Sequence, residues 1–205
     1  MRIRQVVSTF SLAILTVALA IGGGTTVSAE TKSIDGPEYD EKGRLVRPEN
    51  YREWINIGTG IGMVYGPLRD QPGGGQAFTN VFVNPSSYRA FLTSGVWPDR
   101  TMFVLEIRHS ATVNNSKTGN NGRFQGEVMG IEAHVKDEAR FEKGGWAFFN
   151  LSMRERSGAM IPTSASCYSC HETNAAVDNT FVQFYPELRD VAKKHGTFKN
   201  VPEVF

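Results

Sequence analysis

The sequence predicts an α+β fold with a mostly antiparallel β-sheet and flanking helices, and three observations indicate this class. Four segments have the composition of β-strands, and two of them, residues 77–83 and 101–110, have the period of two that is typical of strands. The segments are short and hairpin-length links join neighbours, which favours antiparallel pairing. Helical patterns occur at the front, in the middle and at the end of the chain, so helices should flank the sheet.

The first 29 residues have the parts of a secretory signal peptide. Arg2 and Arg4 precede an apolar run at residues 10–21, and small residues follow at 27–29. An uncleaved membrane anchor is the alternative, but about twelve apolar residues fall short of the roughly 20 that span a bilayer. We therefore expect export to the periplasm, cleavage after residue 29 and no membrane association of the mature protein.

The rest of the chain has the size and composition of one domain. The full sequence has 205 residues, of which 40% are apolar, enough for a single core. We expect an extended segment over residues 30–48 and a single domain over residues 49–205. Cleavage would remove two of the 22 basic residues and none of the 21 acidic ones, leaving about −1 net charge, which argues against a nucleic-acid partner.

Local signals place three helices. Asn50 is expected to cap a short helix in YREWINI, where apolar residues recur at helical spacing. Asn84-Pro85 and Gly95 are expected to bound a second helix, SSYRAFLTSG. Helical periodicity returns over residues 178–195, with a break or a new start at Pro186.

Strands and loops fill the intervening stretches. The Pro- and Gly-rich residues 65–76 should interrupt regular structure, and the polar residues 114–122 should form a hairpin loop. The four predicted strands span residues 77–83, 101–110, 127–135 and 146–154.

The two cysteines stand in one motif, Cys167-Tyr-Ser-Cys170-His171. This is the attachment pattern of c-type haem, in which each thiol adds to one vinyl group and the histidine becomes the proximal ligand of the iron. A disulfide is the default for two cysteines in an exported protein. A zinc site would need two further ligands at suitable spacing, and the other histidines are isolated in the sequence: His109, His134 and His195. The motif together with export favours one covalently bound haem c.

Several segments resemble the cytochrome P-460 fold, which cytochrome P-460 and cytochrome c′-β share. They are NYREW, NPSSYRAF, MGIEAHVKDEARF, GGWAFFNL and CYSCHETNAAVDNTFVQFYPEL. The resemblance implies a homodimeric periplasmic protein in which a mostly antiparallel sheet lies over one face of a five-coordinate, high-spin haem. His171 would be the proximal ligand.

Two chemistries occur within the family that this chain resembles. Cytochrome P-460 proteins oxidise hydroxylamine and carry an extra haem bond from a lysine just before a strand glutamate, whereas this chain has Leu105 before Glu106. Proteins of the c′-β kind lack that bond and bind nitric oxide and carbon monoxide at an apolar distal site. Leu105 fits the second pattern, and we expect Phe78 and Phe82 to line the same pocket.

Glu132 is the candidate catalytic residue. Hydroxylamine-oxidising members of the family use a distal glutamate as a proton relay, and the matching position in GIEAHVKD is Glu132. Apolar neighbours would desolvate this carboxyl, which raises a pKa and suits proton transfer. A solvated strand residue or a salt-bridge partner is the alternative interpretation.

The sequence thus leaves three functions. The leading hypothesis is an exported cytochrome that binds nitric oxide, as c′-β does. The first alternative is an enzyme that oxidises hydroxylamine through Glu132 and passes electrons to a redox partner. The second is an electron-transfer cytochrome, which would need a sixth ligand such as a methionine. The candidates are Met102, Met129, Met153 and Met160, and alternation places Met102 on the face opposite Leu105.

Overall fold

The computed structural model describes residues 35–63, 76–115, 120–142, 144–151 and 153–201. The predicted signal peptide and nearly all of the predicted break at residues 65–76 lie outside these ranges. The described residues belong to one structural unit, residues 34–205. None of the helices described combines the length and apolar character of a membrane-spanning segment.

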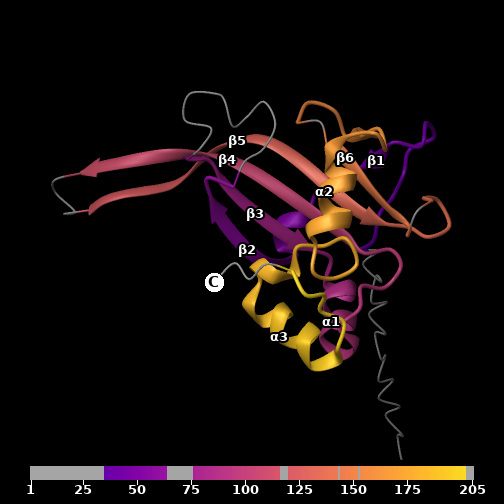
Figure 1. The fold of residues 1–205 in the computed structure, drawn as a ribbon. Coiled ribbons are helices and arrows are strands. Elements are labelled where there is room, and N and C mark those ends of the chain that lie inside the picture. Colours follow the sequence, from indigo (N-terminus) through magenta and orange to yellow (C-terminus); the bar gives the residue numbers. More distant parts are fainter. Residues whose placement is uncertain (1–34, 64–75, 116–119, 143, 152, 202–205) are drawn as a thin grey trace, which may run out of the picture. The chain divides into compact units, whose positions relative to one another are not determined.

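Seven strands form one sheet in the order β1-β7-β6-β5-β4-β3-β2, and every paired neighbour is antiparallel (Figure 1). The predicted α+β class is therefore confirmed. The strands are β1 Leu45–Val46, β2 Ile55–Ile61, β3 Phe78–Val83, β4 Met102–Asn115, β5 Asn120–Lys136, β6 Trp146–Leu151 and β7 Ser157–Met160.

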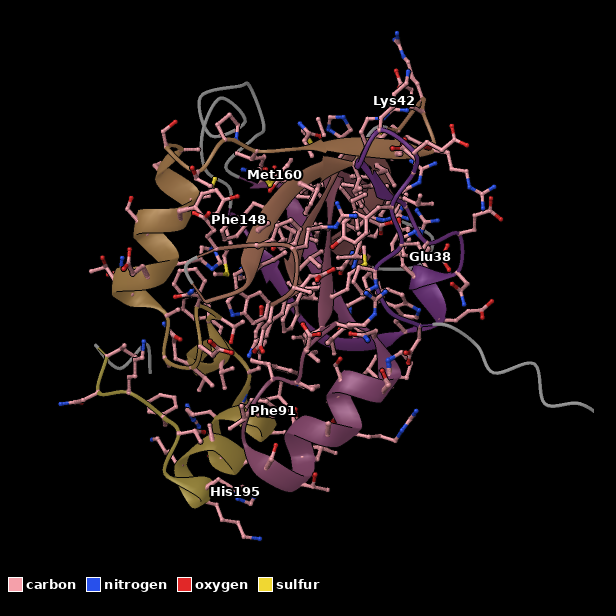
Figure 2. All side chains as sticks on the ribbon, turned by 90° about the vertical axis from the view of Figure 1, so that its right-hand side faces the viewer. Glu38, Lys42, Phe91, Phe148, Met160 and His195 are labelled. Carbon is pink, nitrogen blue, oxygen red and sulfur yellow. The ribbon has the colours of Figure 1, made fainter. Side chains whose placement is uncertain are left out.

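The helices are α1 Pro85–Ser94, α2 Ser166–Asn174 and α3 Pro186–His195, with single 3₁₀ turns η1 Tyr51–Glu53 and η4 Val182–Phe184. The predicted helix α1 is confirmed: Pro85 occupies its first turn, and Gly95 ends it with a φ of 68°. Pro186 is a new start rather than a break, because it opens α3. Helices α1 and α3 pack against each other, with Phe91 between them (Figure 2).

The prediction of a helix in YREWINI is wrong. Only residues 51–53 form one 3₁₀ turn, and Ile55–Ile61 is strand β2. The sequence INIGTGI alternates β-branched residues with glycine, and Gly is unfavourable within a helix. Pairing with β3 gives these backbone groups their hydrogen bonds, so tertiary structure overrides the short helical pattern.

The predicted polar loop at residues 114–122 is shorter than expected. Strand β4 continues to Asn115 and β5 begins at Asn120, so the two strands form a long hairpin that extends beyond its neighbours (Figure 1). Side chains near this end, such as Thr112 and Phe124, are exposed. A two-stranded ribbon with solvent on both faces needs no alternation of apolar and polar residues. The sequence pattern therefore does not show that the two strands continue into this region.

The two faces of the sheet carry separate cores. On one face, Phe82, Val104, Ala133 and Phe149 alternate into a cluster that also contains Leu45 from β1. The segment predicted as an extended lead-in thus contributes to the sheet and to its core. The second core lies on the other face, where the C-terminal segment and helices α1 and α3 pack against the sheet; its largest buried residues are Trp97, Phe91, Phe103, Trp146 and Leu188.

Candidate functional site

Helix α2 carries the cysteine motif beside the sheet. Cys167 and Cys170 lie three residues apart, about one turn of the helix, so their thiols are on the same side. Both thiols are free; Cys167 is half-buried and Cys170 is exposed. Burial raises the pKa of the Cys167 thiol. The pair is therefore available for covalent attachment to a group that lies against this side of the helix.

His171 follows the second cysteine and is oriented by a backbone carbonyl. Its Nδ1 lies 2.7 Å from the carbonyl oxygen of Asn179. Because a carbonyl oxygen can only accept, Nδ1 must carry the proton of this hydrogen bond, and Nε2 keeps its lone pair. Burial lowers the pKa of His171, which favours the neutral imidazole that binds a metal.

Aromatic rings surround His171. The ring centroids of Phe181 and Phe148 lie 4.4 Å and 4.7 Å from that of His171, both in edge-to-face geometry. Phe148 comes from β6, on the side of the sheet that faces α2 (Figure 2), and its ring also meets that of Tyr168. The imidazole therefore lies in an apolar surround from which water is largely excluded.

The structure brings a second histidine to this site, His134, which is isolated in the sequence. His134 of β5 is 8% exposed, and its ring stacks on that of Phe148 at 4.1 Å. Its Nε2 has no hydrogen-bond partner in the described part of the protein. Burial lowers the pKa of His134 well below its usual value. The His134 ring is packed against Phe148, Trp146 and His171, so it forms part of the aromatic surround of the motif.

His134 and His171 do not face each other across a gap. Their ring centroids are 4.9 Å apart in edge-to-face contact. Two metal–nitrogen bonds of about 2 Å each, plus the two rings, need more space than this. His134 therefore contacts the His171 imidazole directly and is not placed to bind the same metal ion from the opposite side.

Leu105 and Glu132 lie next to each other on the face of the sheet that carries Phe148. They are direct partners in the register of β4 and β5, and Val81 pairs with Leu105 on the other side. Both are only partly buried, whereas most of their neighbours along the strands are buried. The Glu132 carboxylate lies close enough to Cys167 to raise the pKa of its thiol, after burial. Leu105, Glu132 and the cysteine motif are thus brought together.

Phe78 and Phe82 do not belong to this group, and the prediction that they line a pocket with Leu105 is corrected. Because Val81 pairs with Leu105, alternation turns Phe82 to the opposite face, where it pairs with Val104. There its ring meets that of Tyr51 at 5.7 Å. Phe78, four residues before Phe82, shares that face. Met102 also lies in the opposite core, as alternation with Leu105 predicts.

The residues fit a haem. Two free thiols stand on one side of a helix, a neutral imidazole keeps its Nε2 available, and aromatic rings exclude water around it. Beside them Leu105 is partly exposed on an otherwise mostly buried stretch of the sheet, which leaves an apolar surface next to the motif. Together these are the groups that hold and enclose a c-type porphyrin.

Comparison with known proteins agrees with this fit. The sequence model of the family described as Cytochrome P460 matches residues 48–182. This range includes β2 to β7 and the cysteine motif of α2. Curated proteins gave no match. Because the matched range covers well over half of the chain, this protein is a haem cytochrome that belongs to the cytochrome P460 family.

Proposed function

We propose that the protein is an exported, homodimeric cytochrome with one covalently bound haem c, whose five-coordinate, high-spin iron binds nitric oxide at an apolar distal site. Bound haem supplies an iron centre that coordinates a diatomic ligand. The observation that carries the proposal is Leu105, which occupies the partly open sheet face beside the cysteine motif and offers no hydrogen-bond donor.

Each residue of the site has a defined task in this proposal. Cys167 and Cys170 form the two thioether bonds, and His171 binds the iron through Nε2 while Nδ1 donates to Asn179. Phe148 and Phe181 keep water away from the imidazole. His171 would hold the iron from one side, and the bound haem would supply an iron that can coordinate a small ligand.

An apolar distal side selects among diatomic ligands. Bound dioxygen gains negative charge and is stabilised by hydrogen-bond donors, whereas nitric oxide binds ferrous iron well without them. The variant that tests this is Leu105→Asn, which adds an amide donor on a side chain with the same branching and the same number of non-hydrogen atoms. We expect the wild-type ferrous protein to bind nitric oxide and to bind dioxygen weakly, and Leu105→Asn to gain at least tenfold in dioxygen affinity.

The matched control is Leu92→Asn, a substitution of an exposed leucine on α1. It should leave both affinities unchanged. Failure of the wild-type ferrous protein to bind nitric oxide while its iron is five-coordinate would reject the proposal. An unchanged dioxygen affinity in Leu105→Asn would show that residue 105 does not face the bound ligand.

Glu132 supports a second candidate, oxidation of hydroxylamine. It is the cross-strand partner of Leu105 and acts electrostatically on Cys167, so an acid lies beside the proposed haem site and could accept protons from a substrate. An external acceptor would have to remove the electrons. Turnover with hydroxylamine and an artificial acceptor tests this candidate, and sustained turnover that Glu132→Ala abolishes would favour it over nitric oxide binding.

A further inference from the structure

A tight turn holds the carbonyl that orients His171. Residues Val177 and Thr180 pair through two backbone hydrogen bonds, from Thr180 N–H at 2.7 Å and from Val177 N–H at 3.3 Å. The central residues Asp178 and Asn179 have φ values of 41° and 60°. Positive φ at both central positions is typical of a type I′ turn, which Asn and Asp tolerate better than other non-glycine residues.

This conformation decides where the acceptor for His171 lies. The carbonyl oxygen of Asn179 is 2.7 Å from Nδ1 of the imidazole. Consecutive non-glycine residues at positive φ persist only where their surroundings hold them. Any relaxation of the turn would rotate this carbonyl and weaken its hydrogen bond to the histidine.

Lys136, at the end of β5, makes several of the contacts that keep this turn in its conformation. It is only 7% exposed, and its ammonium group lies 2.8 Å from the Asp178 carboxylate. The same group donates to the carbonyl oxygen of Trp97 at 3.0 Å and lies 3.3 Å from the Glu138 carboxylate. A buried ammonium with three oxygen partners is fixed in place, so it anchors Asp178 to the end of strand β5.

Trp97 secures the other side of the turn. Its indole N–H donates to the hydroxyl of Thr180 at 2.8 Å, and that hydroxyl donates to the carbonyl oxygen of Val177 at 2.6 Å. Lys136 therefore contacts the turn directly at Asp178 and indirectly through Trp97. These contacts link the sheet to the carbonyl that accepts from His171.

We propose that Lys136 is a positioning residue for the iron-binding histidine: it holds Asp178, and thereby the Asn179 carbonyl, so that Nδ1 of His171 stays hydrogen-bonded. This inference rests on the proposed role of His171 as the axial ligand. A strong acceptor at Nδ1 makes the imidazole a more basic ligand and strengthens its bond to iron. In the described part of the protein, the ammonium group of Lys136 contacts Asp178, Trp97, Glu138 and the Trp146 ring, so its effect on the imidazole would be indirect.

The test is the iron–histidine stretching band in the resonance Raman spectrum of the ferrous holoprotein. Lys136→Met should shift this band to lower frequency, because the imidazole loses basicity, and should raise the reduction potential. Lys199→Met is the matched control, since Lys199 is an exposed lysine of the C-terminal segment. It should leave both readouts at their wild-type values.

A second substitution decides the matter if Lys136→Met does not fold. Asp178→Asn keeps the side-chain volume and an oxygen acceptor but removes the charge, and it should shift the band in the same direction by a smaller amount. An unchanged band in the folded Lys136→Met or Asp178→Asn protein, even with a lower Tm, would overturn the inference and leave the proposed function intact. Absence of the band from the wild-type protein would overturn both, because His171 would then not be the sole axial ligand.

Discussion

Replacement of Glu106 by glutamine should destabilise the fold because this carboxylate is buried and shared. Glu106 is 1% exposed and lies on β4, next to Leu105 but on the opposite face of the sheet. It accepts hydrogen bonds from the Tyr51 hydroxyl, from Arg52 at 2.8 Å and from Arg108 at 2.5 Å. Burial acts to raise the pKa of Glu106, but the hydrogen bonds from these three residues outweigh it and lower the pKa.

The magnitude follows from the exposure of the two arginines. Loss of one partner from a buried ion pair costs about 3 to 5 kcal/mol, whereas an exposed pair contributes about 0 to 1 kcal/mol. The Arg52 side chain is 52% exposed and that of Arg108 is 24% exposed, so water compensates much of the loss. We therefore expect Glu106→Gln to lower the free energy of unfolding by about 2 to 3 kcal/mol at pH 7.

The effect should also depend on pH in a defined direction. The folded-state pKa of Glu106 is depressed, so its stabilisation is present above the unfolded pKa and is lost as the pH falls through the folded pKa. The difference between wild type and Glu106→Gln should be constant from about pH 5 to pH 8 and should shrink below about pH 4.

Urea unfolding of the holoprotein, followed by far-UV circular dichroism at pH 7 and pH 3.5, measures this difference. Glu53→Gln is the control, because Glu53 is an exposed carboxylate in the same 3₁₀ turn as Tyr51 and Arg52. It should change the free energy of unfolding by less than about 0.5 kcal/mol. Equal stabilities of the two variants, or a difference that stays constant down to pH 3.5, would mean that the ionised Glu106 carboxylate does not stabilise the fold.

Further predictions concern packing, a hydrogen bond and cofactor attachment. Gly158→Ala should cost about 2 kcal/mol or more, because the added methyl would overlap the backbone of Asn150, whereas Gly122→Ala meets nothing and should be neutral. Tyr168→Phe removes the hydroxyl that accepts from the Phe148 N–H at 3.3 Å, and should lower stability by about 1 to 2 kcal/mol. Urea titrations measure both effects. Substitution of both cysteines by alanine should abolish haem retained on a denaturing gel.

A specific result would contradict each of these three predictions. An unchanged free energy of unfolding in Gly158→Ala would mean that β6 and β7 can move apart to fit the methyl group without loss of stability. Wild-type stability of Tyr168→Phe would mean that water replaces its hydroxyl at Phe148. Haem that remains attached after loss of both thiols would require another covalent bond from the protein.

The sequence predicts those features that depend on residues close together in the chain. Helix α1 was readable because Asn84-Pro85 and Gly95 mark its two ends by their backbone preferences. The spacing of Cys167, Cys170 and His171 predicts covalent haem attachment, and the family match supports the haem itself. Strands β1 and β7, with two and four residues, are too short to show periodicity.

The parts of the site that could not be predicted from the sequence depend on strand register and on contacts between distant residues. Alternation along β3 places either Val81 or Phe82 beside Leu105, and only the pairing with β4 selects Val81. His134 reaches the site because β5 pairs with β6 and α2 packs on β6, contacts that join residues far apart in the chain. The contact of Lys136 with Asp178 likewise spans 42 residues, and no local pattern records it.

The most direct test of the whole account is the absorption spectrum of the reduced protein before and after titration with nitric oxide. The reduced protein should start with a five-coordinate, high-spin ferrous spectrum, because His171 is the proposed axial ligand and Met102 lies in the opposite core. Nitric oxide should then bind with saturation at one molecule per chain. A six-coordinate, low-spin spectrum that nitric oxide leaves unchanged would contradict the account.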